Sequence, residues 1–269
     1  MEQTRIPAQY ATGASRPDIE RALAAAGKDL EHLTPADLAL LEDFHSSGRI
    51  ATYQLAALLD PSPATRVLDA GTGIGGTARY LASQFGCRVT GIDMSEDYCA
   101  TARWLDSLVG LDDRIEVHRA DVTELPFPDA VFDVVISQHV QMNVADKDRL
   151  YGEARRVSTD GGRLAVWDIV SGDGDALDYP LPWADGPEDS HLISATALRT
   201  AIEAAGFAID HWADLTEETA ETMRTVLSMP PNPLGLHAFV PEFRTRAEHL
   251  TSALGDGRLR AVRAVAVAK

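Results

Sequence analysis

The feature that most constrains this chain is a glycine-rich segment between a strand-like apolar run and a helix-like run. Residues 67–76 read VLDAGTGIGG. Glycines at such a turn allow a tight backbone and let a ligand approach main-chain atoms closely. Gly71, Gly73 and Gly76 also satisfy the G-x-G-x-x-G dinucleotide fingerprint, which is weakly specific by itself. The segment predicts an α/β domain with a ligand at this turn.

Strand-like and helix-like segments alternate through the rest of the chain. Helix starts carry capping residues, such as Thr34 before Pro35 and Ser95 before two acids. Short apolar runs predict seven strands, at 66–70, 88–92, 115–118, 131–137, 163–170, 207–212 and 260–268. This order predicts a Rossmann-like α/β fold, with a seven-stranded mostly parallel sheet, helices on both faces, N-terminal helices and a small helical lid insertion.

Three parts of the chain stand outside this alternation. Residues 1–60 read as helices, and we expect them to form an N-terminal helical segment that packs over the ligand site of a main domain at 61–269. Residues 171–190 are rich in Gly, Pro and Asp, and residues 216–256 are helical. Ligands bind beyond the carboxyl ends of strands in open α/β sheets, so both are expected to be lid or substrate elements. Plain surface loops are the alternative.

The charge of the chain limits the classes of partner. The formal net charge is −17. So acidic a surface repels nucleic-acid phosphates and anionic membranes, and we expect neither as a partner. No apolar run approaches the ~20 residues needed to cross a bilayer, and the N-terminus lacks a signal-peptide core. The sequence therefore predicts a soluble, cytoplasmic protein.

Three acids stand near the predicted carboxyl ends of neighbouring strands. Asp93 ends the second strand, where a carboxylate can accept both ribose hydroxyls of an adenosine. Asp121 follows the third strand, where an adenine amino group can be held. Asp69 lies just before the first glycine, where it would repel a pyrophosphate and attract a sulfonium or an α-amino group. These positions favour a sulfonium nucleotide over NAD.

Four motifs in this order resemble those of class I S-adenosylmethionine (SAM)-dependent methyltransferases. They lie at residues 67–75, 91–95, 120–135 and 154–164. Residues 44–52, FHSSGRIAT, are similar to the helix before the glycine turn in glycine, sarcosine and dimethylglycine N-methyltransferases and in sterol and tocopherol C-methyltransferases. The resemblance implies that 61–269 is a methyltransferase domain and that SAM is the cofactor, with S-adenosylhomocysteine (SAH) as its product.

The resemblance also implies a cofactor site. The glycine turn would line the methionine part of SAM, the second strand's end the ribose and adenine face, the third strand's end the adenine edge, and the fourth strand's end the sulfonium. The residues of the glycine turn are Gly71, Thr72 and Gly73, with Asp69 before them. Those at the ends of the second and third strands are Asp93 and Met94, and Asp121 and Val122. Gln138 ends the fourth strand.

The expected chemistry needs no nucleophile from the protein, because the cofactor carries an activated methyl group. The protein must orient an acceptor and take its proton, which a histidine suits near neutral pH. His139, after the fourth strand, is the first candidate, and Asp168, at the end of the fifth, is the second. The alternative role of His139 is only to pack in its loop or to contact the cofactor, and the alternative role of Asp168 is only to cap its loop.

Four further residues are candidates for contact with the acceptor. Arg49 suits a carboxylate and Asn143 can orient a polar group, whereas Trp183 lies in the first lid segment and His191 directly after it. No histidine spacing indicates a metal site. We expect a small-molecule acceptor with an amine or a hydroxyl. The alternatives are C-methylation of a prenyl or sterol-like lipid in a cavity built by residues 216–256, a non-catalytic SAM-binding protein, and an NAD-dependent oxidoreductase.

Overall fold

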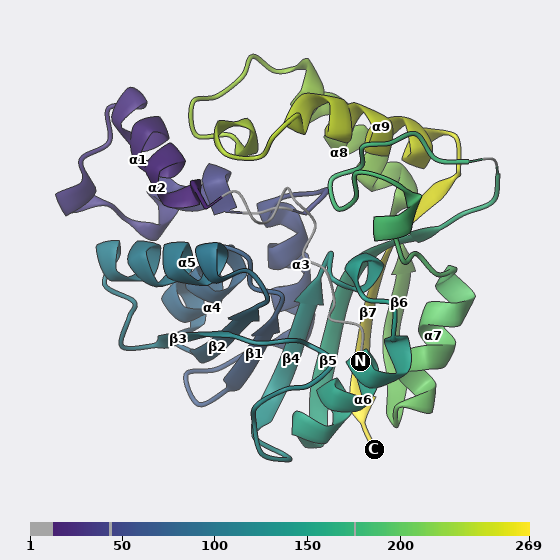
Figure 1. Ribbon diagram of the computed structural model, residues 1–269. Helices are drawn as coiled ribbons and strands as arrows, with labels where there is room; N and C mark the ends of the chain where they lie inside the picture. The colour runs from purple at the N-terminus through teal and green to yellow at the C-terminus, as the bar shows by residue number, and fades with distance from the viewer. Residues whose placement is uncertain (1–12, 43–44, 175) are drawn as a thin grey trace.

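The computed structural model describes residues 13–42, 45–174 and 176–269, and a single sheet crosses its centre (Figure 1). The order of the strands is β3-β2-β1-β4-β5-β7-β6. β7 is antiparallel to both neighbours, and the other pairs are parallel. The mostly parallel seven-stranded sheet is confirmed. Its strands are β1 (Arg66–Ala70), β2 (Arg88–Asp93), β3 (Ile115–Arg119), β4 (Phe132–Gln138), β5 (Ser158–Ser171), β6 (Phe207–Asp214) and β7 (Leu259–Ala268).

The chain reverses its direction of winding at β1. This strand pairs with β2 on one side and with β4 on the other, and Ala70 is in register with both Ile92 and Ser137. The loops that leave β1 and β4 therefore diverge at the carboxyl edge of the sheet. Such a switch point is where open α/β sheets bind ligands.

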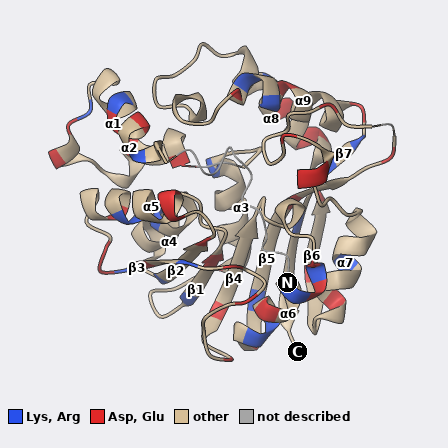
Figure 2. Ribbon diagram, viewed as in Figure 1, with Lys and Arg blue, Asp and Glu red and all other residues tan. Residues whose placement is uncertain are grey.

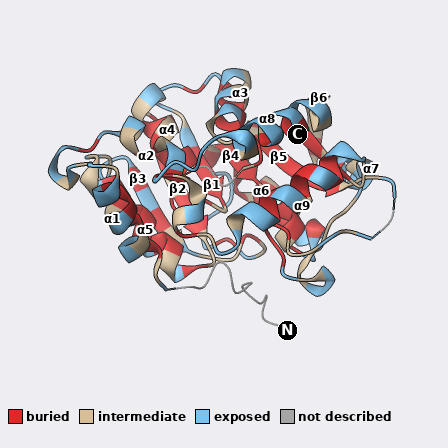
Figure 3. Ribbon diagram, turned by 90° about the horizontal axis from the view of Figure 1, so that it is seen from above, coloured by how far each residue is buried: buried red, intermediate tan, exposed pale blue. Residues whose placement is uncertain are grey.

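Helices cover both faces of the sheet, as expected. α3 (Arg49–Leu59), α4 (Gly76–Phe85) and α5 (Glu96–Leu108) pack on one face, and α6 (Lys147–Val157) and α7 (Ala195–Ala204) on the other. Successive strand residues point to opposite faces, which gives two apolar layers. Figure 3 shows the buried positions along the strands and on the inner sides of the helices.

The first two helices lie beyond the carboxyl edge of the sheet. α1 (Ser15–Ala25) and α2 (Pro35–Glu42) form an apolar cluster with α5 and with the segment around η5 (Leu236–Ala238). α3, in contrast, packs against the sheet itself. Residues 1–12 and 43–44 of the predicted N-terminal segment lie outside the described residues, and the boundary at residue 60 stays a prediction.

The two predicted lid segments pack against each other. α8 (Thr216–Ser228) and α9 (Phe243–Gly255) share an apolar cluster with the loop after β5, where Leu181 and Trp183 are buried. Arg246 of α9 donates a hydrogen bond to the carbonyl of Leu181 at 2.7 Å. Figure 1 shows this unit above the carboxyl edge, opposite α1 and α2. No helix of the described chain is long and apolar enough to cross a membrane.

A buried charge cluster joins the glycine turn to two helices. Arg79 of α4 contacts Glu42 of α2 at 2.5 Å and Asp106 of α5 at 2.7 Å, and all three side chains are at most 2% exposed. The Arg79 guanidinium also donates to the carbonyl of Ile74 in the turn. Arg49 contacts the second oxygen of Glu42 at 2.6 Å. Other charges of both signs are spread over helices and loops (Figure 2).

Arg79→Met is expected to reduce the free energy of unfolding by about 3–5 kcal/mol, because it leaves buried carboxylates without their shared cation. The control is Arg244→Met, which breaks a pair with Glu248 whose side chains are 69% and 50% exposed. That change should cost less than about 1 kcal/mol. Urea unfolding of both variants checks this, and equal losses would contradict the assigned role of the cluster.

Candidate functional site

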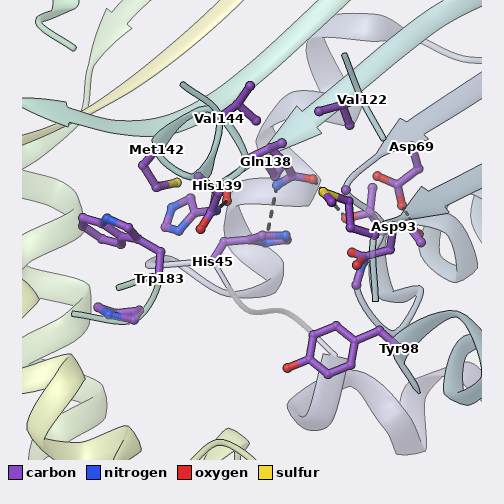
Figure 4. Close-up of a pocket in the computed structure, with 18 of the residues that line it drawn as sticks. His45, Asp69, Asp93, Tyr98, Val122, Gln138, His139, Met142, Val144 and Trp183 are labelled. Carbon is purple, nitrogen blue, oxygen red and sulfur yellow. Dashed lines mark hydrogen bonds between the residues drawn. The ribbon is translucent and has the colours of Figure 1, made fainter. Parts of the chain in front are cut away.

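A cavity opens at the switch point, between the carboxyl edge of the sheet and the helices above it (Figure 4). All nine predicted cofactor residues line it, and so do His139, Asn143 and Trp183. The remaining lining comes from α2 and His45 after it, the first turns of α4 and α5, the loops after β3, β4 and β5, and residues 236–243. The structure therefore gathers twelve of the fifteen predicted site residues around one cavity.

The glycine turn needs its glycines for both conformation and space. Gly71 and Gly73 have φ of 83° and 55°, in the left-handed region that side chains disfavour. The N–H groups of Gly71 and Thr72 donate to the carbonyl of Ile92 at 2.9 and 2.8 Å. A Cβ atom at Gly71 would lie 2.3 Å from a methyl carbon of Val140. The turn therefore packs directly against the loop after β4.

Asp69 lies buried below the turn. Its carboxylate accepts a hydrogen bond from the hydroxyl of Thr72 at 2.6 Å. Burial raises the pKa of Asp69 to about 7, and the nearby charge of Asp93 adds to this effect. The side chain therefore titrates near neutral pH and gains from a cation placed beside it.

Asp93 directs both carboxylate oxygens at the loops around it. One accepts from the N–H of Gly73 at 3.0 Å, and the other from the N–H of Ser95 at 2.8 Å. Each oxygen has capacity for a further hydrogen bond, so the group can accept two neighbouring hydroxyls. Asp121 is held similarly by the N–H and hydroxyl of Thr123, at 2.8 and 2.7 Å. These hydrogen-bond acceptors fit the ribose hydroxyls and the amino group of an adenosine.

Gln138 at the end of β4 is oriented by its neighbours. Its amide oxygen accepts from the hydroxyl of Thr77 at 3.0 Å, and its amide nitrogen donates to Nδ1 of His45 at 3.4 Å (Figure 4). The ring of His45 lies edge-on to that of His139, with centroids 5.9 Å apart. Two imidazoles thus lie together beside the switch point.

Hydrogen bonds hold both the backbone and the ring of His139. Its φ is 56°, a conformation that concentrates at functional sites, and its N–H donates to the carbonyl of Trp167 at 2.8 Å. The N–H of Ser46 donates to Nε2 of His139 at 3.4 Å, and the Ser46 hydroxyl lies 3.1 Å from that nitrogen. Burial, with a smaller effect of His45, lowers the pKa of His139 to about 3. The imidazole is therefore neutral, with Nε2 as its acceptor atom.

Asn143 and Trp183 are fixed at the far side of the cavity. The amide of Asn143 donates to the carbonyl of His139 at 3.3 Å, whereas its oxygen is buried without a hydrogen-bond partner among the described residues. The indole N–H of Trp183 donates to the hydroxyl of Ser190 at 2.9 Å. The apolar ring of Trp183 lies at the cavity wall (Figure 4).

Three predicted site residues do not line the cavity. Asp168 is fully buried behind it and accepts from the N–H of Gln141 at 3.5 Å, so it supports the loop after β4. Burial raises its pKa well above the usual range. Arg49 pairs with Glu42 instead of facing a ligand. The N–H of His191 donates to the carbonyl of Met142 at 2.8 Å.

Several lining residues were not predicted as site residues. His45 belongs to the segment 44–52, whose resemblance already indicated the site, although Phe44 lies outside the described residues. Tyr98 follows the cap of α5 by one turn, which is a usable signal. Residues 236–243 carry no periodic pattern that points to a ligand. Of the apolar side chains in 216–256, Met223 is in the core, Val226 and Met229 are exposed, and Phe243 reaches the cavity.

Known proteins share these features. A family model described as a methyltransferase domain matches residues 68–166. The glycine/sarcosine/dimethylglycine N-methyltransferase of Actinopolyspora halophila is 36% identical over 132 residues, which are 49% of this chain and 23% of that relative. The chain thus spans about a quarter of the length of that protein.

Two further proteins match over more of their length. Geranyl diphosphate C-methyltransferase from Streptomyces coelicolor A3(2) shares the fold, with a TM-score of 0.72, 20% identity, and coverage of 98% of this chain and 96% of that one. Methyltransferase GfsG of Streptomyces halstedii is 31% identical over 198 residues, which cover 71% of this chain and 70% of that relative. With the family model, this shows that the chain belongs to the S-adenosylmethionine-dependent methyltransferase family.

Proposed function

We propose that this protein transfers the methyl group of SAM to an amine or a hydroxyl of a small molecule. The observation that carries this proposal is the convergence of the glycine turn, Asp93 and Asp121 on one cavity at the switch point. The names of the curated relatives as methyltransferases support the same reaction class.

The cofactor half of the cavity is proposed to bind SAM through the residues around β1, β2 and β3. Asp93 accepts hydrogen bonds from the ribose hydroxyls, and Asp69 faces the positively charged methionine end of SAM. Asp121 lies at the adenine edge beside Val122. SAM supplies a methyl group on a positively charged sulfur, so no side chain acts as a nucleophile. The buried carboxylate of Asp69 instead favours a cationic ligand at the turn.

The loop after β4 is proposed to orient the acceptor. Neutral His139 receives the acceptor's proton at Nε2, where the acceptor takes the place of the long 3.4 Å hydrogen bond from the N–H of Ser46. Asn143 offers its buried carbonyl oxygen, and Trp183 packs against the acceptor's apolar part. Asp168 acts through the loop by holding the N–H of Gln141, and is a positioning residue.

Asp93→Asn is expected to weaken SAH binding by roughly ten- to a hundredfold, because charge-assisted hydrogen bonds to the ribose are lost. The amide oxygen still accepts from one loop N–H, which preserves the fold. Isothermal titration with SAH measures the affinity, with the exposed Asp113→Asn as the matched control. Equal affinity of the two variants would refute the ribose assignment.

SAM affinity is expected to rise by up to roughly tenfold between pH 6 and pH 8. Asp69, with a pKa of about 7 in the free protein, is mostly protonated at the lower pH and mostly ionised at the higher one. The ionised form attracts the positively charged cofactor, so binding strengthens as pH rises through 7. Titrations of the wild type and Asp69→Asn across this range check the effect. A pH slope that is unchanged in the variant would rule out Asp69 as its source.

His139→Asn is expected to lower kcat by roughly a hundredfold and to change SAH affinity less than threefold, because the side chain serves the acceptor. Asparagine tolerates the positive φ at this position. Single-turnover rates with a confirmed acceptor and SAH titrations separate the two effects. An unaltered kcat would remove His139 from the reaction.

A further inference from the structure

We propose that the methyl acceptor is an uncharged, largely apolar molecule that presents a hydroxyl group to His139. This inference rests on the proposed function and specifies its substrate class. It follows from how the two halves of the cavity differ in charge.

Sheet order separates the cavity's carboxylates from the acceptor side. Asp121, Asp93 and Asp69 belong to the β3, β2 and β1 side of the switch point. The fourth lining carboxylate, Glu42, is bound by both Arg79 and Arg49. The acidic groups therefore serve the cofactor half and the charge cluster.

The acceptor half has apolar walls from three separate parts of the chain. Its lining includes Met142, Val144, Trp183, Leu236, Val240 and Phe243. The two imidazoles described above lie between these walls and Gln138. Tyr98, which shares an apolar cluster with Leu236 and Val240, is a further titratable side chain near these walls, and its phenol is uncharged near neutral pH. Figure 4 shows Met142, His139 and Trp183 grouped on the side of the cavity away from Asp69 and Asp93.

These surroundings disfavour a charged acceptor of either sign. An anion would approach the three carboxylates without a cation in the lining described here to compensate. An ammonium would lose its hydration among apolar side chains, and one cation–π contact with Trp183 returns less than that loss. An uncharged acceptor loses the least solvation and gains from burying its apolar surface.

The state of His139 favours oxygen over nitrogen as the methylated atom. An ammonium must lose its proton before it attacks. His139 lies beside a second imidazole and on the side of the cavity lined by Met142 and Trp183, away from the carboxylates, so it is too weak a base to remove that proton. A hydroxyl becomes strongly acidic while it forms its new bond. Its oxygen bonds to the methyl carbon as the carbon–sulfur bond breaks, sulfur keeps that electron pair, and the hydroxyl proton passes to Nε2 of His139.

The test compares three probes with one carbon skeleton and different charge: geraniol, geranylamine and geranyl diphosphate. Binding to the full chain saturated with SAH is measured by titration calorimetry, and methylated product is measured separately with SAM. We expect geraniol to bind at least about tenfold more tightly than either charged probe, and to be the probe that is O-methylated.

The outcomes separate this inference from the proposed function. Failure of SAH to bind would overturn the function itself. Binding of SAH together with equal or tighter binding of geranylamine or geranyl diphosphate, or with no binding of any probe, would overturn the inference alone.

A charge placed in the acceptor half provides a second test. Phe243→Glu should shift the preference toward geranylamine by at least about tenfold relative to wild type. Val226→Glu, at a position on α8 that is 48% exposed, is the matched control and should leave the preference unchanged. The same preference in both variants would show that Phe243 does not face the acceptor, and would contradict the inference.

Discussion

The guanidinium of Arg79 fixes the geometry on which the site depends. It is fully buried and connects the carboxylates of α2 and α5 with a carbonyl of the glycine turn. Burying these charges is costly unless each keeps its partner. The cluster therefore favours the observed arrangement of α2, α4 and α5, which positions the turn beside the cavity.

The sheet order then divides the cavity into two halves. Loops after β1, β2 and β3 carry carboxylates, whereas the loop after β4 carries histidine, methionine and asparagine. The unit formed by α8, α9 and the loop after β5 adds apolar walls. The proposed pair of a positively charged cofactor and an uncharged acceptor would thus meet complementary surroundings on opposite sides of one switch point.

Much of this fold is predictable from the sequence, because its signals are local. Ser95 caps α5 through the N–H of Tyr98, as its position before two acids indicates, and the apolar run near 132–138 forms a central strand. The glycine turn and its acids also predict the cofactor side of the cavity. Each of these signals lies within a few residues of the structure that it specifies.

Contacts between separate elements account for what the sequence does not predict. Arg49 is paired with Glu42 across a bend in the chain, and Asp168 is buried under a loop 27 residues earlier. The wall built by Leu236, Val240 and Phe243 depends on how residues 236–243 pack against α1 and α2. The periodicity of the sequence indicates which side chains are apolar, but it does not indicate which of them are in contact in the folded protein.

The most direct test of this account is a calorimetric titration of the purified protein with SAH and, separately, with NAD. Asp93 at the end of β2 predicts saturable binding of SAH at one site per chain, and Asp69 below the glycine turn, which would repel a pyrophosphate, predicts no measurable binding of NAD. Binding of NAD without binding of SAH would contradict the account, and the glycine turn would then be a dinucleotide site.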